Sequence, residues 1–124
     1  MKKNLILSMV LGLMACAPKT ESVCGVYQGT LPAADAPGVE TTLTFDKDNR
    51  VLQQLVYIGK NDGAFTEQGR FSTEGEIVRV MFSDEEVDYY RLEKGQLRRL
   101  DMNKQPVEGA MANHYILKKV KGCK

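Results

Sequence analysis

The amino-acid sequence predicts an all-β protein: a small up-and-down meander barrel of about eight antiparallel strands. Two observations support this fold class. Short runs rich in β-branched and aromatic residues follow one another at hairpin spacing, separated by turns rich in Gly, Asn and Asp. No window carries the sustained apolar period of an amphipathic helix. Because an open meander leaves unpaired edges, closure into a barrel is the arrangement that we expect.

The clearest predicted strand covers residues 39–45, in which apolar or β-branched residues alternate with polar ones. One face of this strand carries Val39, Thr41, Leu43 and Phe45. The turn-like compositions of 46–49 and 60–63 then bound the next strand. The predicted strands are, in order, 24–30, 39–45, 50–59, 65–72, 76–82, 87–92, 96–100 and 114–120.

The N-terminal segment has the order of a bacterial lipoprotein signal. Lys2 and Lys3 precede an apolar run over residues 5–15, and Cys16 follows a small residue. The run is too short to cross a hydrocarbon core of about 30 Å as a helix, and no stop-transfer pattern follows, which argues against a membrane-spanning helix. We therefore predict a signal peptide over 1–15 that is removed, with Cys16 as the acylated first residue of the mature chain.

Acylation of Cys16 predicts a protein held on a bacterial membrane. Two or three acyl chains, such as palmitate, anchor a protein essentially permanently, since each buried methylene contributes about 0.8 kcal/mol. Ala17 follows the cysteine, whereas Asp at that position often marks inner-membrane retention in enteric bacteria, so we favour the outer membrane. The short polar stretch 16–23 is predicted to be a flexible tether.

The length and charge of the mature chain limit its partners. Removing 15 of the 124 residues leaves 109, enough for one domain with a working core. Loss of Lys2 and Lys3 takes the formal net charge from +1 to −1. Such a chain has no electrostatic footprint for nucleic acid or for an anionic membrane surface. We therefore expect no nucleic-acid partner.

Cys24 and Cys123 remain, one at each end of the predicted barrel. In a meander with an even number of strands, the start of the first strand lies beside the end of the last. An oxidising envelope favours a disulfide between these cysteines, and a bridge that closes a loop of about 100 residues contributes on the order of 4–5 kcal/mol in the chain-entropy model. The alternative is two free thiols. A redox role is less favoured, because neither cysteine lies in a Cys-x-x-Cys spacing.

Several segments, spread over most of the mature chain, carry a family resemblance. Residues 27–45 read Tyr-Gln-Gly-Thr-Leu-Pro-Ala-Ala-Asp-Ala-Pro-Gly-Val-Glu-Thr-Thr-Leu-Thr-Phe. Weaker parallels are Tyr57-Ile58-Gly59, Tyr89-Tyr90-Arg91, Leu100-Asp101 and Pro106-Val107-Glu108. Together they resemble the N-terminal domain of the NlpE family of envelope-stress and copper-resistance lipoproteins. The resemblance implies a small lipocalin-like β-barrel, here over 24–124, on an acylated cysteine.

The loop after the first predicted strand departs from that family. Family members commonly have Cys-Ala-Asp-Cys where this chain has Ala33-Ala34-Asp35-Ala36. A thiolate pair can bind a soft metal or cycle as a dithiol, and alanines do neither. We therefore expect no metal or cofactor at this loop. Longer family members also have a second, smaller domain, which we do not expect here, so we do not expect their full signalling role to carry over whole.

The same loop, residues 31–38, is the favoured recognition element for a protein partner in the envelope. Functional residues concentrate on loops that a rigid scaffold holds in place. The candidate residues are Leu31, Pro32, Asp35 and Gly38.

Histidine and methionine offer little chemistry. His114 is the only histidine and cannot build a nucleophilic triad alone. It could at most share Cu(I) with the thioethers of Met102 or Met111. We favour a partly buried packing role for His114 in the last strand and core filling for the methionines.

Charged residues near the predicted hairpin turns are expected to be solvated. Glu85, Glu86 and Asp88 would act as acid and base only in a cleft that splits their pKa values, and we place them on a turn instead. Arg98 and Arg99 point to opposite faces of a strand. We favour surface positions for both over an interior guanidinium that meets an anionic ligand.

The leading hypothesis is a non-enzymatic, lipid-anchored sensor or adaptor in the envelope-stress or metal-stress response. No nucleophile and base occur together, which disfavours an enzyme. The alternative is a lipocalin-like carrier of a small apolar ligand. A carrier needs a cavity of about 300 Å³ or more, and an interior packed solid by Phe45, Phe71, Phe82 and the tyrosines would exclude it.

Overall fold

The computed structural model describes residues 22–34, 36–83 and 85–123, and every structural statement below concerns these ranges. The predicted signal peptide and Cys16 lie outside them, as does Asp35. In chain order the elements are β1 (Gly25–Leu31), β2 (Val39–Phe45), β3 (Arg50–Tyr57), β4 (Ala64–Glu74), β5 (Ile77–Met81), β6 (Val87–Glu93), β7 (Gln96–Leu100), the short 3-10 helix η1 (Gly109–His114) and β8 (Ile116–Gly122).

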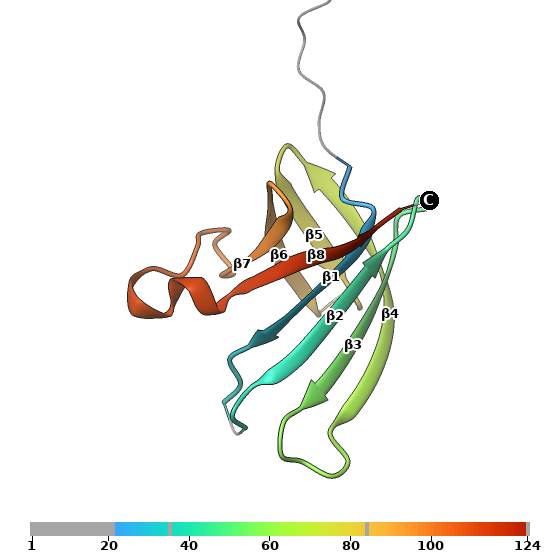
Figure 1. Cartoon of the computed structure of the whole chain (residues 1–124). Coiled ribbons are helices and arrows are strands. Elements are labelled where there is room, and N and C mark those ends of the chain that lie inside the picture. Colours follow the sequence, from blue (N-terminus) through green and yellow to red (C-terminus); the bar gives the residue numbers. More distant parts are fainter. Residues whose placement is uncertain (1–21, 35, 84, 124) are drawn as a thin grey trace, which may run out of the picture.

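The strands form one closed antiparallel barrel. Each strand pairs with the next in the chain, and β1 pairs with β8 to close the sheet (Figure 1). The predicted all-β meander barrel is confirmed. The alternation expected over 39–45 is also confirmed, because Val39, Thr41, Leu43 and Phe45 are the buried residues of β2. Among the described residues, no helix is long and apolar enough to cross a membrane.

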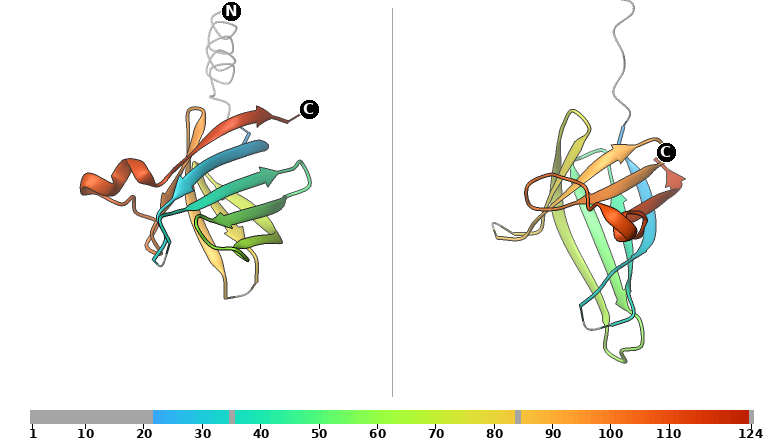
Figure 2. Two further views of the ribbon diagram at one scale, coloured as in Figure 1. Left: turned by 60° about the horizontal axis from the view of Figure 1, so that its bottom comes forward. Right: turned by 90° about the vertical axis from the view of Figure 1, so that its left-hand side faces the viewer.

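The last strand begins later than the sequence predicts. We expected it over 114–120 with His114 partly buried, but η1 ends at His114, which is exposed. This helix contains two Ala residues and a Met, which helical turns accommodate easily. Arg98 Nη1 donates a hydrogen bond to the Ala112 carbonyl oxygen at 3.2 Å, and this bond ties η1 to β7. The loop that contains η1 projects to the side of the barrel (Figure 2).

The two ends of the barrel differ. At one end, which we call the tether end, the described chain begins at Ser22, β8 ends, and the turns after β2, β4 and β6 lie (Figure 1). At the other end, which we call the mouth, lie the connections after β1, β3, β5 and β7. The 31–38 loop is therefore at the opposite end of the barrel from Ser22.

Aromatic and aliphatic side chains fill the half of the barrel nearer the tether end. Phe45 contacts both Tyr27 and Phe71 edge to face, with ring centroids 5.7 Å and 5.0 Å apart. Buried aliphatic residues surround these rings, namely Val23, Leu43, Val51, Val78, Val80, Leu92, Leu97 and Leu117. The packed domain therefore begins by Val23, which the sequence placed in the tether. The Val23 carbonyl oxygen accepts a hydrogen bond from the Tyr27 hydroxyl at 2.9 Å.

The seam between β1 and β8 is close and cross-linked. A Cβ on Gly29 would lie 2.5 Å from the Ile116 carbonyl oxygen, so only glycine lets the two backbones approach here. At the tether end, Cys24 and Cys123 are joined by a disulfide, with Cα atoms 5.4 Å apart and a sequence separation of 99. The first and last strands are thus held together where they begin and end.

Candidate functional site

The mouth half of the barrel holds a cavity of about 460 Å³. One wall is largely apolar and comes from the 31–38 loop, β2 and β3, through Leu31, Pro32, Ala33, Ala34, Val39, Leu55 and Tyr57. The other wall is polar and comes mainly from β4, the β5–β6 turn, β6 and β7, through Glu67, Glu86, Asp88, Tyr90 and Arg99. Thr41 of β2 and Gln53 of β3 complete the lining. We call this cavity the mouth cavity.

Strand register brings the polar residues together. Asp88 and Tyr90 are two positions apart on β6, so both face the interior. Tyr90 pairs across the ladder with Arg99 of β7. Glu67 comes from the first half of β4, which pairs with β3, while the β4–β5 ladder begins only at Arg70. Glu86, on the β5–β6 turn, lies close enough to Glu67 to affect its pKa.

Negative charge exceeds positive charge in the mouth cavity. Arg99 Nη2 donates to Asp88 Oδ1 at 2.9 Å, so the one guanidinium of the lining is already paired. Glu67 and Glu86 remain as additional carboxyl groups. Burial raises the pKa of Glu67, and the neighbouring carboxylates of Glu86 and Asp88 raise it further. Like charges held close together favour the protonated form in this way.

The hydroxyl group of Tyr90 is buried without a partner. The side chain is almost completely buried, with 1% of its surface exposed, and its oxygen has no hydrogen-bond partner in the described structure. Burial raises the pKa of Tyr90 to about 12, against the lowering effect of nearby Arg99. Buried hydroxyl groups are nearly always satisfied, so the Tyr90 oxygen is available to bond a water molecule or a ligand in the mouth cavity.

The 31–38 loop forms one rim of the mouth cavity. Leu31, Pro32, Ala33 and Ala34 line it, and Leu31 is buried. The loop is fixed to the next hairpin, because the Ile58 amide donates to the Gly38 carbonyl oxygen at 3.0 Å. Of the predicted recognition residues, the structure thus brings Leu31 and Pro32 to the cavity and uses Gly38 to hold the loop.

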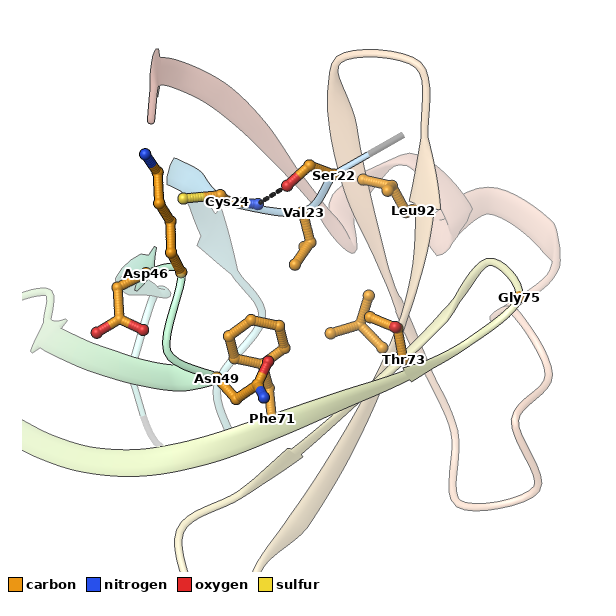
Figure 3. Close-up of a pocket in the computed structure, with 11 residues that line it drawn as sticks. Ser22, Val23, Cys24, Asp46, Asn49, Phe71, Thr73, Gly75 and Leu92 are labelled. Carbon is orange, nitrogen blue, oxygen red and sulfur yellow. Dashed lines mark hydrogen bonds between the residues drawn. The ribbon is translucent and has the colours of Figure 1, made fainter. Parts of the chain in front are cut away.

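A second pocket, of about 370 Å³, lies at the tether end. Figure 3 shows Val23 and Phe71 on facing sides of it, with the chain from Ser22 to Cys24 running past. The carboxylate of Asp46 is nearby, but it accepts hydrogen bonds from the Asp48 and Arg50 amides of its own turn, at 2.8 Å and 2.9 Å. These bonds hold the pKa of Asp46 below its usual value.

The mouth cavity is therefore the better candidate site. Its polar groups converge from four separate segments and include an unused hydroxyl, whereas Asp46 at the tether end is satisfied within a single turn.

The structure corrects several predictions about charged residues. Asp88 and Arg99, which we placed at the surface, line the mouth cavity, and Glu86 borders it while remaining exposed. Arg98 does point to the other face of β7, where its Nε donates to Glu93 Oε2 at 2.8 Å. Glu85 is exposed as expected.

The sequence analysis did not single out Glu67 or Tyr90. The signal for Tyr90 was available, because Asp88, Tyr90 and Leu92 alternate on β6 and Leu92 is an obvious core residue. The place of Glu67 depends on which residue of β3 it faces, and that register is not visible in the sequence.

The histidine and methionine candidates lie elsewhere. His114, Met102 and Met111 are all exposed on the β7–β8 connection, so the expected packing roles are wrong for each of them. Within the described ranges, no three His, Cys, Asp or Glu side chains are grouped so that they could hold a metal ion.

Comparison with known proteins identifies the family. The sequence profile of the NlpE N-terminal domain matches residues 27–110. This chain belongs to the NlpE family. The fold and the family predicted from the sequence segments are thereby confirmed.

Two lipoproteins of this kind are similar in sequence. A 17 kDa lipoprotein of Treponema pallidum (strain Nichols) is 32% identical over 109 residues, covering 78% of this chain and 70% of the relative. Lipoprotein NlpE of Escherichia coli (strain K12) is 30% identical over 84 residues, covering 66% of this chain but only 36% of NlpE. The chain therefore spans about a third of that relative. Neither name denotes an enzyme.

Two crystal structures share the fold. A lipoprotein from Shewanella oneidensis superimposes with a TM-score of 0.70 at 36% identity, covering 78% of this chain and 88% of that one. The Cpx pathway activator NlpE from E. coli superimposes with a TM-score of 0.62 at 29% identity, covering 68% of this chain and 46% of that one. The NlpE barrel is therefore the common element.

Proposed function

We propose that this NlpE-family protein is a lipid-anchored envelope lipoprotein, in the outer membrane, that acts as a sensor or adaptor in a stress response through a protein partner. The observation that carries the proposal is family membership over residues 27–110, with relatives that are themselves lipoproteins. The E. coli relative is a Cpx pathway activator. The proposal assigns no reaction, because none of the relatives named above is an enzyme by name.

The position of the 31–38 loop suits the presentation of this loop to a partner. Ser22 lies six positions after Cys16, and this stretch spans at most about 20 Å when fully extended. An acyl anchor on Cys16 would therefore hold the tether end of the barrel near the bilayer. The mouth and its loop would then face away from the membrane, where a partner in the envelope can reach them.

Site-specific crosslinking in cells tests the partner. A photo-crosslinking residue at Ala34, which is exposed on the mouth rim, is expected to capture one defined envelope protein. The matched control carries the same group at Lys47, which is exposed at the tether end. Equal background capture at both positions, or none at either, would count against the adaptor function.

Mass spectrometry tests the anchor. The mature protein should begin with an acylated Cys16, and Cys16→Ser should release the protein from the membrane fraction. A mature protein with an unmodified N-terminal cysteine would remove the lipoprotein part of the proposal.

The second candidate function is a carrier of a small ligand, and the mouth cavity favours it. Its volume of about 460 Å³ lies within the range of small-molecule sites, and the aromatic core fills only the other half of the barrel. The polar wall, however, does not suit the purely apolar ligand that the sequence suggested.

A further inference from the structure

We infer that the mouth cavity binds a primary alkylammonium group, with the charged head among Glu67, Glu86 and Tyr90 and the apolar body against the 31–38 loop. This inference refines the carrier alternative. It does not depend on the existence of a protein partner.

The charge of the polar wall selects a cation. Three carboxyl groups, from Glu67, Glu86 and Asp88, face one guanidinium. That guanidinium, on Arg99, is paired with Asp88 at 2.9 Å. Neither Glu67 nor Glu86 is paired with a positive charge of the lining, because Arg99 is paired with Asp88. A bound ammonium would supply that positive charge and so relieve the repulsion between the two carboxylates. An anionic ligand would have to displace Asp88 from Arg99.

Tyr90 points to a ligand independently of the carboxylates. Its hydroxyl oxygen is buried in the lining and has no hydrogen-bond partner in the described structure. An orphan hydroxyl lowers stability, because folding removes it from water without replacing its hydrogen bonds. An ammonium group has three N–H donors, enough for the tyrosine oxygen and two carboxylates at once.

The opposite wall requires an apolar body on the same ligand. Pro32, Ala33 and Leu55 contribute hydrocarbon surface, and the small side chains of Ala33 and Ala34 leave room beside the rim. An unbranched alkyl chain is the simplest apolar body with which to test this wall. Among the described residues, no three His, Cys, Asp or Glu side chains are grouped so that they could hold a metal ion. The mouth cavity is therefore proposed for an organic cation and not for a bare metal ion.

Isothermal titration calorimetry with n-hexylamine tests the inference. The protein is purified from the cell envelope, with its anchor, in a neutral detergent. We expect one site with a dissociation constant of roughly 10⁻⁵ to 10⁻³ M, as for efficient small ligands. Hexan-1-ol and hexanoate have the same body without the positive charge, and both should bind at least ten times more weakly. Equal binding of hexan-1-ol, or no binding of hexylamine, would overturn the proposal.

Two sources of the alkylammonium group can be separated in the same experiment. Hexylamine represents a free small amine, and Nα-acetyl-lysine methylamide represents a lysine side chain on a protein. Binding of hexylamine alone indicates a small-molecule site, whereas comparable binding of the lysine derivative indicates that a lysine side chain also fits.

Substitutions locate the site. Glu67→Gln and Glu86→Gln each remove one charge-assisted hydrogen bond and should weaken hexylamine binding about 10-fold. Tyr90→Phe removes the hydrogen bond from the ammonium to an uncharged oxygen, which is weaker than one to a carboxylate, and should weaken hexylamine binding about 3- to 10-fold. Glu74→Gln, an exposed glutamate at the tether end, is the control and should change nothing. Equal effects of Glu74→Gln and Glu67→Gln would show non-specific attraction and overturn the site.

The pH dependence gives a readout that a structural role would not produce. Titratable or charged groups around Glu67 in the lining are Glu86, Asp88, Tyr90, Tyr57 and Arg99. Because Glu67 must be ionised to bind the ammonium, hexylamine binding should weaken as the pH falls from about 7 to about 4, beginning above the usual glutamate range. Glu67→Gln should shift this loss to lower pH. An unchanged profile in the variant would contradict the assignment.

Discussion

The two halves of the barrel interior are built from different side chains. Near the tether end, Tyr27, Phe45 and Phe71 pack edge to face inside a shell of buried aliphatic residues. Near the mouth, the same barrel surrounds a cavity of about 460 Å³ with three carboxyl groups, a guanidinium and an orphan hydroxyl. The comparison teaches that the packed half near the tether end stabilises the fold. This stability lets the half near the mouth keep polar groups whose burial is unfavourable.

The largest expected effect concerns the cross-link at the tether end. Replacing Cys24 and Cys123 together by serine should lower the free energy of unfolding by about 4–5 kcal/mol, since the bridge closes a loop of 99 positions. Urea unfolding monitored by circular dichroism measures this loss. Reduction of the unchanged protein is the matched control and should give the same value. A variant as stable as the parent would show that the packed half does not need the bridge.

The next effect separates packing in the two halves. Phe45→Ala should lower the free energy of unfolding by about 3–5 kcal/mol, because Phe45 is buried between two rings. Leu55→Ala, on the wall of the mouth cavity, should cost about 1–2 kcal/mol, since a cavity already adjoins this side chain. Chemical unfolding of both variants gives the comparison. Equal losses would mean that the mouth half is as tightly packed as the tether half.

The same substitution at two tyrosines should have opposite signs. Tyr27→Phe removes a hydroxyl that donates to the Val23 carbonyl oxygen and should cost about 1 kcal/mol. Tyr90→Phe removes an unsatisfied buried hydroxyl and should raise the free energy of unfolding by about 1 kcal/mol. Thermal unfolding of the ligand-free variants measures both. A loss of stability in Tyr90→Phe would reveal a hydrogen-bond partner for that hydroxyl.

The smallest effect compares two glutamates. Hydrogen bonds from Arg98, and then from Gln96 and Arg91, lower the pKa of Glu93 to about 2. The ionised form of Glu93 therefore stabilises the fold above about pH 4.5, and this contribution is lost as the pH falls toward about 2. After allowance for solvent screening, Glu93→Gln should cost at most about 1 kcal/mol at neutral pH.

Glu67 should behave in the opposite way. Its pKa is raised, first by burial and then by Glu86 and Asp88, so its preference for the protonated form stabilises the fold in acid and is lost as the pH rises through the raised pKa. Glu67→Gln should therefore be slightly more stable than the parent at neutral pH and equal to it in acid. Urea midpoints measured against pH for both variants test this, and parallel curves for Glu67→Gln and Glu93→Gln would refute the contrast.

Much of the fold could be predicted from local patterns. The alternation over 39–45 and the turn residues at 46–49 determine β2 and its hairpin without reference to the rest of the chain. The start of β8 could not be predicted in this way. Its position depends on η1, which Arg98 holds through a hydrogen bond across 14 positions of sequence.

The candidate site was harder to predict, because we assigned Asp88 and Arg99 to the surface on the basis of their charge. Asp88 and Arg99 are residues that usually face water. They lie inside because side chains two positions apart on a strand share a face. Asp88 shares its face of β6 with buried Tyr90, and Arg99 shares its face of β7 with buried Leu97. Each also finds its counter-ion there, which no single strand segment reveals. The loop 31–38, in contrast, could be placed at the rim once the number of strands was known.

The disulfide also has a mechanical consequence. It lies directly beside the point where the chain enters the barrel at Ser22. A pull on an anchor attached upstream would arrive at the start of β1, where backbone hydrogen bonds alone would otherwise have to hold β1 to β8. With Cys24 bonded to Cys123, the load passes into β1 and β8 together. The covalent link would let the barrel bear tension between a membrane and a partner at the mouth without opening at its seam.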